Sequence, residues 1–291
     1  MSSHHHHSNI GIKFIERFNH YTKGVQLPRE LIVIGAGNMA GCMVAAFIDK
    51  GCFTKEEVIL VTKSEESAEI WREAGYLRSC SLNTFIESRN ALEPAHRILL
   101  LAVKPQIRHE LYVKLRMNDY VLKAEIVCSI LAGITHETLK KEIEEIFIGP
   151  LIRLTPNVPS AVGSGVTLLY GPNEHANEVA THLLRSTGEV ISISEKYFNC
   201  ASAITGSGPA FAFLMIDALA DGAVLNGLPR ESAIRMAALM LRGASDLVLQ
   251  TGKHPGQLKD QVCSPNGTTI EGIRALEKNG AQAHCLEFDQ L

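Results

Sequence analysis

The sequence predicts two domains, an α/β domain built on a parallel sheet and then an all-helical domain. Short, continuously apolar segments alternate with helical patterns from residue 30 to about residue 157, and two further short apolar segments follow. A glycine-rich turn joins the first apolar segment to the first helical one, and from Pro209 onward almost every pattern is helical. Continuous apolar strands that alternate with helices are typical of a parallel sheet covered on both faces.

The apolar segments are the expected strands, and the amphipathic segments between them are the expected helices. In chain order, strands are expected in 30–34, 57–64, 97–105, 125–134, 151–157, 165–171 and 188–194. Helices are expected from the glycine turn to about Lys50, in 67–75 and in 135–146.

The second part of the chain is expected to be helical, with long helices in 209–227 and 229–252. The first of these is apolar on most sides, which indicates burial on nearly all sides. Because the domain is small, a second copy of the chain is expected to supply part of that cover. The resulting division is an N-terminal extension over 1–29, an α/β domain over 30–195 and a helical domain over 196–291.

Composition excludes several classes of function. The net charge of −3 provides no basic field for nucleic acid and no polybasic patch for a membrane. The longest apolar run is interrupted by Asp217 and Asp221, so no membrane span is expected. The seven cysteines are scattered and form no CxxC pair. This argues against a disulfide framework or a zinc site and favours a reducing compartment.

The first residues need separate treatment. His4–His7 resemble a purification tag and are left out of the fold argument. The segment 9–29 has some amphipathic helical spacing with basic residues, but it also contains Glu16, and transit peptides are poor in acidic residues. A cytoplasmic location is expected, with mitochondrial import as the alternative.

The turn after the first strand has the spacing of a dinucleotide site. Gly35, Gly37 and Ala40 follow the pattern G-x-G-x-x-A between a strand and a helix. The first glycine permits the tight turn, the second lets a pyrophosphate approach the backbone, and the alanine keeps the helix close to the sheet. The α/β domain is therefore predicted to be of the Rossmann type.

The end of the second strand predicts which dinucleotide is bound. An acidic residue there would bind the ribose of NAD, whereas this chain has Thr62, Lys63 and Ser64, which suit the 2′-phosphate of NADP. Glu65 and Glu66 follow and weaken the cationic field. NADPH is favoured as the cofactor, and NADH remains possible. The alternative interpretation of Thr62, Lys63 and Ser64 is that they are solvated turn residues without a cofactor contact.

Several motifs together resemble the pyrroline-5-carboxylate reductase family. They are "GAGNMA" at 35–40, "AVKPQ" at 102–106, "TPNVP" at 155–159, "ITGSGPAFAF" at 204–213, "DALADGAVLNGLPR" at 217–230 and the segment 254–280. The resemblance covers about residues 30–284. It implies NAD(P)H-dependent reduction of 1-pyrroline-5-carboxylate, a cyclic imino acid, to L-proline. It also implies a helical domain that interlocks two subunits, often within larger rings.

The resemblance also implies site residues. Cofactor contacts are expected from Gly35, Ala36, Gly37, Asn38, Met39, Thr62, Lys63, Ser64, Asn83, Ala102, Val103, Lys104, Pro105, Ser129, Asn157 and Gln261. For Lys104, which ends a strand at the edge where such folds bind ligands, the residues themselves favour the same role. Substrate contacts are expected from Glu195, Val262, Ser264, Gly267, Thr268 and Thr269, with Thr269 as the catalytic residue at the imine nitrogen.

The stretch "SPNGTTIEG" at 264–272 supports this expectation from its own chemistry. Thr268 and Glu271 have the spacing of a capping box, which predicts a helix whose first amide groups point outward. With Gly267 leaving the backbone bare, these amides could hold a carboxylate, although a plain helix cap would have the same pattern. Asn266 stands where the family has a second glycine, and asparagine tolerates the left-handed backbone that this turn requires.

One departure from the family leaves alternatives open. The family continues through another long helix after the point where this sequence ends, so the helical domain is expected to be short at its C-terminal end. The alternatives are a non-catalytic NADP-binding member of the family and a reductase of another cyclic imine. A hydroxy-acid reductase has less support, because the stretch 206–221 lacks the lysine that such enzymes usually carry there.

Overall fold

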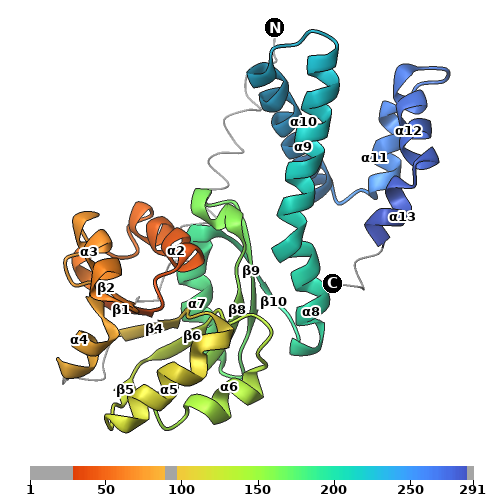
Figure 1. Ribbon diagram of the computed structural model, residues 1–291. Helices are drawn as coiled ribbons and strands as arrows, with labels where there is room; N and C mark the ends of the chain where they lie inside the picture. Colours follow the sequence, from red (N-terminus) through yellow and green to blue (C-terminus); the bar gives the residue numbers. More distant parts are fainter. Residues whose placement is uncertain (1–28, 89–96, 287–291) are drawn as a thin grey trace, which may run out of the picture. The chain divides into compact units, whose positions relative to one another are not determined.

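The computed structural model describes residues 29–88 and 97–286, so the predictions for the N-terminal extension lie outside the described residues. The chain divides into two compact units, 1–206 and 207–291. The first contains the strands and the second is helical (Figure 1). Each unit is described by itself.

The first unit is built on an eight-stranded sheet with the order β10-β9-β8-β6-β4-β1-β2-β3. All neighbouring strands are parallel except β8 and β9. The strands are β1 (Glu30–Ile34), β2 (Val58–Thr62), β3 (Cys80–Ser81), β4 (Arg97–Leu101), β6 (Ile126–Ser129), β8 (Leu151–Thr155), β9 (Gly165–Tyr170) and β10 (Gly188–Ser192). Two short strands, β5 (Leu122–Lys123) and β7 (Phe147–Ile148), form a separate parallel pair.

The predicted parallel sheet is confirmed, with one antiparallel pair within it. The link between β8 and β9 contains only the short helix η3 (Val158–Val162), and Thr155 pairs with Leu168 in an antiparallel register. A parallel pairing needs a crossover of a dozen or more residues, which this link cannot supply. The next crossover does contain a helix, α7 (Glu174–Leu184), and β10 therefore runs parallel to β9.

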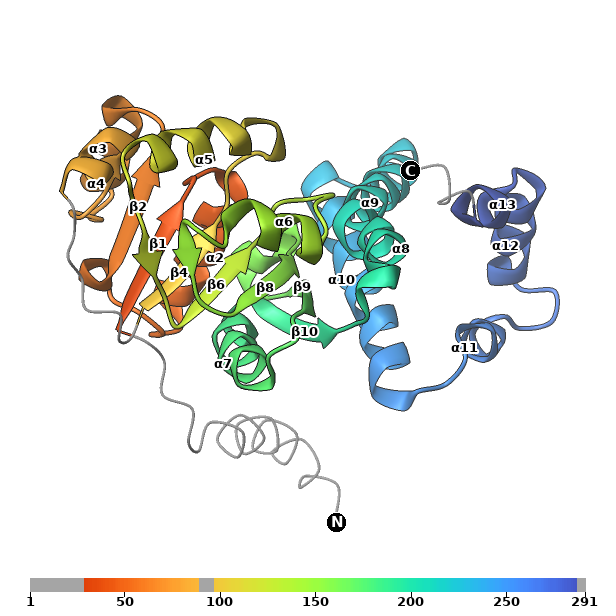
Figure 2. The same cartoon turned by 90° about the horizontal axis from the view of Figure 1, so that it is seen from below.

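Helices cover both faces of the sheet because the strands bury alternate residues on opposite sides (Figure 2). Leu31 and Val33 of β1 face α2 (Asn38–Asp49) and α7, while Ile32 and Ile34 face the other layer. That layer consists of α4 (Leu82–Glu87), α5 (Arg108–Met117) and α6 (His136–Ile143). The helix α3 (Glu65–Glu73) begins at Ser64, whose hydroxyl accepts a hydrogen bond from the Ser67 N–H.

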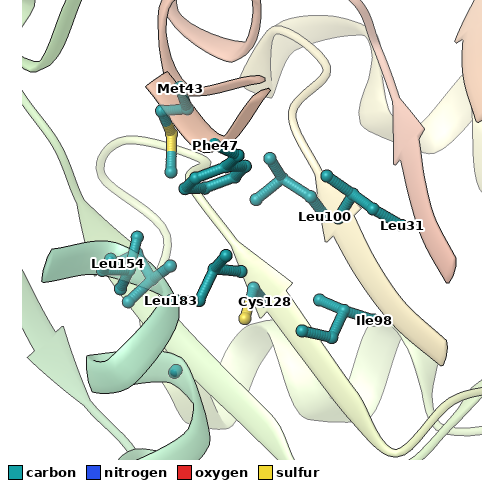
Figure 3. Close-up of a pocket in the computed structure, with 10 residues that line it drawn as sticks. Leu31, Met43, Phe47, Ile98, Leu100, Cys128, Leu154 and Leu183 are labelled. Carbon is teal, nitrogen blue, oxygen red and sulfur yellow. The ribbon is translucent and has the colours of Figure 1, made fainter. Parts of the chain in front are cut away.

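The core under α2 and α7 is closely packed. Figure 3 shows Met43 and Phe47 of α2 facing Leu100 and Cys128 of the sheet, with Leu183 of α7 beside them. The void among these side chains is about 10 Å³, room for a single water at most. Burial in this apolar core raises the pKa of the Cys128 thiol to about 12, which disfavours the nucleophilic thiolate.

The first compact unit extends beyond β10 to residue 206. The segments η5 (Glu195–Tyr197), α8 (Phe198–Ser202) and the π-helical turn η6 (Ala203–Ser207) follow β10. Phe198 is buried, with its ring edge-on to Tyr170 and under the guanidinium of Arg153. These contacts keep α8 in the first unit, a packing that the change from strand to helix patterns does not reveal.

The second unit consists of α9 (Gly208–Leu225), α10 (Arg230–Thr251), α11 (Pro255–Val262), α12 (Thr268–Lys278) and α13 (Ala281–Leu286). The helices α9 and α10 pack against each other, and Arg230 pairs with Asp221 beside the turn that joins them. Among its described side chains, only Ala220, Ala233 and Ala237 are buried. The long apolar helices predicted by the sequence are therefore largely uncovered within one chain.

One helical run within the described part of the chain, Glu195–Leu225, meets the length and composition criteria for a membrane span, with a mean hydropathy of 1.5 in its window. This run contains Asp217 and Asp221 and still meets the criteria, although the sequence analysis expected no membrane span. The core helix of a soluble protein meets the same criteria, so this finding alone is weak support for a membrane location.

Candidate active site

The carboxyl ends of four neighbouring strands meet at one edge of the first unit. Ile34 at the end of β1 is in register with Val61 of β2 and Leu101 of β4, and Leu101 is in register with Ser129 of β6. Ligands of open α/β sheets bind outside this edge, at the point where the connections that follow two neighbouring strands go to opposite faces of the sheet. The predicted cofactor residues that follow these strands are therefore brought to one place.

Gly35 lies where only glycine fits. Its φ is +97°, and a Cβ there would lie 2.6 Å from the backbone nitrogen of Val103 and 2.7 Å from the carbonyl carbon of Ala102. Its N–H donates to the carbonyl of Val61 at 2.9 Å. The turn after β1 is thus held between β2 and the loop after β4, and any side chain at residue 35 would push these segments apart.

Gly37 leaves open space instead. It is the N-cap of α2, it is exposed, and a Cβ there would have no neighbour within 4 Å. No side chain caps the helix, and its first turn contains no acidic residue. Exposed amide groups at a helix start and the positive end of the helix dipole suit a diphosphate. Ala36, Asn38 and Met39 belong to the same turn and first residues of α2.

The three predicted residues at the end of β2 have different environments. Thr62 is buried, and its hydroxyl donates to the carbonyl of Ser64 at 2.7 Å. Ser64 caps α3, and Lys63 is exposed. The hydroxyl of Thr62 is therefore used within the protein, whereas Lys63 presents its cation to solvent.

The charge of Glu65 is matched within the protein. Its carboxylate lies 2.8 Å from Arg72 and accepts a hydrogen bond from the Ser81 N–H at 3.2 Å. The hydrogen bond from Arg72, followed by those from Ser81, lowers the pKa of Glu65. Glu65 therefore weakens the positive field of Lys63 less than the sequence suggests.

The remaining predicted cofactor residues of the first unit lie at or near this edge. Ala102, Val103, Lys104 and Pro105 follow β4, with Lys104 exposed at the N-cap of η2 (Pro105–Ile107). Asn83 is exposed in α4, the helix that directly follows β3. Ser129 is buried at the end of β6, and its hydroxyl oxygen accepts from the Leu131 N–H at 3.3 Å.

Asn157 is buried just after β8, with 6% of its surface exposed. Its Nδ2 donates to the carbonyl of Thr205 at 2.8 Å, and its Oδ1 accepts from the Val166 N–H at 2.8 Å. One N–H and one carbonyl as partners allow a single orientation of the amide group. The side chain thus links β8 to β9 and to η6.

Glu195 is part of a buried ion pair. Its Oε1 lies 2.7 Å from the guanidinium of Arg153 and accepts from the His136 N–H at 2.6 Å. Arg153 is itself buried and stacks on Phe198. The sequence analysis missed Arg153 and His136. The available signal was an arginine within an otherwise apolar strand segment, since a buried charge requires a partner.

The predicted substrate loop lies in the second unit, between α11 and α12. Asn266 has a φ of 56°, which confirms the left-handed turn expected there. A Cβ at Gly267 would lie 2.3 Å from the hydroxyl oxygen of Ser264, so a side chain there would require the Ser264 hydroxyl to rotate away. Gln261 and Val262 end α11, while Thr268 and Thr269 are the first two residues of α12.

The predicted capping box is wrong. Gly267, not Thr268, is the N-cap of α12, and no side chain caps the helix. Glu271 instead pairs with Arg274 at 2.9 Å. Ser264 lies beside Gly267, and the helix α12 begins directly after this glycine, which has no side chain. The amide groups at the start of α12 therefore have no side-chain cap, and this leaves them suited to an anion.

The described residues form no metal site, and a hollow beside α6 is lined by other residues than those predicted for the cofactor and the substrate. No group of three or more His, Cys, Asp or Glu side chains within 29–88 and 97–286 is placed to hold a metal ion. A hollow of about 280 Å³ lies between α6 and the start of β8, lined by residues that include His136, Lys140 and Asn173. None of the residues predicted for the cofactor or the substrate lines it.

Comparison with known proteins gives a consistent result for both units. Residues 195–288 match the family model described as pyrroline-5-carboxylate reductase dimerisation. Residues 30–133 match the model described as NADP oxidoreductase, coenzyme F420-dependent.

Relatives with this family's name cover nearly the whole chain. The pyrroline-5-carboxylate reductase of Synechocystis is 34% identical over 263 residues, 89% of this chain and 93% of that protein. The Escherichia coli protein of that name is 32% identical over 266 residues, 90% of this chain and 94% of that protein.

A solved structure supports the fold. The pyrroline carboxylate reductase of Plasmodium falciparum, with NADP bound, has a TM-score of 0.75 and 24% identity, and the match covers 90% of this chain and 95% of that one. The resemblance inferred from the motifs is confirmed, and the chain belongs to the pyrroline-5-carboxylate reductase family.

Proposed function

We propose that this protein reduces 1-pyrroline-5-carboxylate to L-proline with NADPH, and that NADH is the weaker donor. The observation that carries the proposal is the turn at Gly35–Gly37, where a side chain is excluded at one glycine and open space lies beside the other. This is the backbone that a dinucleotide diphosphate needs. The substrate is supported by the names of relatives whose matches cover 89% and 90% of this chain.

The residues at the edge of the sheet fit the dinucleotide. The start of α2 would hold the diphosphate on its exposed amide groups. Lys63 and the hydroxyl of Ser64 would bind the 2′-phosphate, with the opposing charge of Glu65 balanced by Arg72. Asn83, Ser129 and the segment 102–105 would line the rest of the cofactor. The bound cofactor supplies a hydride, and the protein supplies binding and orientation.

The loop before α12 fits the imino acid. Its carboxylate would lie on the amide groups at the start of α12, beside Gly267 and Thr268, with Val262 and Ser264 around it. The hydroxyl of Thr269 would hydrogen-bond the imine nitrogen. A protonated C=N accepts hydride more readily, so a donor at this nitrogen accelerates the reaction without forming a covalent intermediate. The hydride forms the new C–H bond at the imine carbon. The π electrons of the C=N bond become the lone pair of the nitrogen, which keeps its proton as the N–H amine of proline.

Glu195 is proposed to contact the substrate through one oxygen. Both of its hydrogen bonds to other described residues use Oε1, which leaves Oε2 for a ligand. Arg153 and the His136 N–H would then fix the orientation of the carboxylate. Gln261 at the end of α11 and Asn157 after β8 are proposed as further cofactor contacts.

The second unit is proposed to form the contact between two copies of the chain, as a homodimer or within a larger ring. The matching family model is described as a dimerisation domain. Apolar side chains that are well exposed within one chain lie along α9 and α10, among them Phe213, Leu214, Leu219, Leu225, Met236, Leu239, Met240, Leu247 and Leu249. A surface with so many large apolar residues marks an interaction site in a soluble protein.

Cofactor oxidation tests the proposal. Purified protein is mixed with 1-pyrroline-5-carboxylate and either NADPH or NADH, and the proline formed is quantified. One proline for each NADPH consumed is expected. Tight NADPH binding without turnover would instead identify a non-catalytic member of the family, and turnover only with other cyclic imines would identify a different substrate.

A further inference from the structure

The amide of Asn157 connects three segments of the first unit that are distant in sequence. Asn157 follows β8, its acceptor Oδ1 is bound by Val166 in β9, and its donor Nδ2 is bound to Thr205 in η6. The residue is buried, so replacing one of these bonds with solvent would be costly. The last partner is notable because Thr205 is close to the end of the first unit at Gly206.

The carbonyl of Thr205 has a specific need for this donor. In an α-helix it would accept from the N–H of residue 209, but residue 209 is proline, which has no N–H. The proline ring would also crowd the carbonyl four residues earlier. The helix widens into the π turn η6 at this point, and Asn157 supplies a donor from outside the helix.

The segment after this bond has little stiffness of its own. Gly206 and Gly208 flank Ser207, and the division between the units falls within these residues. Glycine has more backbone freedom than any other residue. The bond from Asn157 to Thr205 is thus the last side-chain restraint from the sheet before the two glycines.

We propose that Asn157 is a positioning residue, which holds the π-helical turn at the end of the first unit by binding the carbonyl of Thr205. The kinetic part of this proposal rests on the proposed function, since hydride transfer requires the cofactor and the imine to be aligned. A misplacement of about 1 Å lowers such a rate by up to about a hundredfold.

The Asn157→Asp variant tests the restraint. An aspartate keeps the acceptor for the Val166 N–H but places an oxygen against the Thr205 carbonyl. The matched control is Asn177→Asp, because Nδ2 of Asn177 also donates to a carbonyl at 2.8 Å, that of Gly171, in the same unit. We expect faster amide hydrogen exchange in residues 203–208 for Asn157→Asp alone, with kcat lowered about tenfold or more.

Pro209→Ala provides the rescue. Alanine supplies the missing N–H, so the double variant Asn157→Asp/Pro209→Ala should recover slow exchange in residues 203–208 and part of kcat. Exchange in Asn157→Asp that equals that of the Asn177→Asp control would overturn the restraint, and unchanged kcat would overturn the positioning role. Hydrogen exchange needs no substrate. A wild-type protein that reduces no imine would therefore contradict the proposed function, while the exchange result would still decide the restraint.

Discussion

The two units of this chain bury their apolar residues to very different extents. In the first, every residue of β2 and β4 is buried, and helices cover both faces of the sheet. In the second, three alanines are the buried residues among the described side chains, and leucines and methionines along α9 and α10 are exposed. The first unit has a core of its own, whereas the second has the surface of a fold completed by another copy.

Cofactor binding and substrate binding therefore depend on different parts of the chain. The cofactor edge is formed by backbone contacts within the first unit, between β1 and the loop after β4. The proposed substrate loop belongs to the unit that lacks a core within one chain. We therefore expect cofactor binding to survive changes that abolish assembly, and catalysis to be lost with them.

Leu214→Lys should have the largest effect. Leu214 is 69% exposed in one chain, and burying a leucine at a dimer contact stabilises by about 1.5–3 kcal/mol per copy. A charge in each copy should therefore raise the dissociation constant by on the order of a thousandfold. Sedimentation velocity should show monomer at concentrations where the wild-type protein is a dimer.

The control for this substitution lies in the first unit. Leu77 is exposed to a similar extent, 72%, but precedes β3. Leu77→Lys should leave assembly unchanged. An unchanged oligomer in Leu214→Lys, or dissociation in both variants, would contradict the comparison between the units.

Glu195→Gln should destabilise the first unit by about 3–5 kcal/mol, because it leaves the buried Arg153 without its counter-charge. The single tryptophan, Trp71, lies in α3 of this unit and reports its urea unfolding. Glu137→Gln removes an exposed ion pair with Lys141 and should leave the unfolding midpoint unchanged. Equal midpoints for the two variants would exclude a structural role for the Glu195–Arg153 pair.

The two glycines of the cofactor turn should respond differently. Gly35→Ala adds a Cβ against Val103 at a φ of +97° and should lower the free energy of unfolding by about 3 kcal/mol. Gly37→Ala meets open space at a φ of −83°, so stability should be unchanged while NADPH affinity falls about tenfold. Wild-type NADPH affinity in Gly37→Ala would contradict the placement of the diphosphate.

Thr269→Ala should lower kcat by about tenfold to a hundredfold while the NADPH dissociation constant stays the same. Thr269→Ser retains the hydroxyl and should keep most of the activity. Stopped-flow measurement of NADPH oxidation separates the two parameters. Equal kcat for the alanine and serine variants would exclude the hydroxyl from the reaction.

Sequence patterns predicted the features that depend on neighbouring residues. The glycine turn after β1 and the left-handed Asn266 could be predicted because backbone geometry there depends on residue type. The apolar pattern of β9 did not reveal its antiparallel direction, because a buried strand has the same pattern either way; the short link after β8 was the available signal. The capping box failed because Thr-x-x-Glu spacing does not reveal that Ser264 approaches Gly267.

The sequence carried no signal for which distant residues pair with each other. Glu195 is separated from Arg153 by 42 residues, and Asn157 is separated from Thr205 by 48. Only the fold brings these groups together. The same applies to the hydrogen bond from the Ser81 N–H to Glu65, whereas Glu65 and Arg72 lie two turns apart in α3 and their pairing is local.

The central claim is that the cofactor edge and the loop before α12 together reduce a cyclic imino acid. The most direct measurement is the rate of NADPH oxidation by the purified oligomer with 1-pyrroline-5-carboxylate, with proline quantified and NADH run in parallel. We predict stoichiometric formation of proline and a higher kcat/KM with NADPH than with NADH. Tight binding of NADPH with no proline formed by an intact oligomer would contradict the claim.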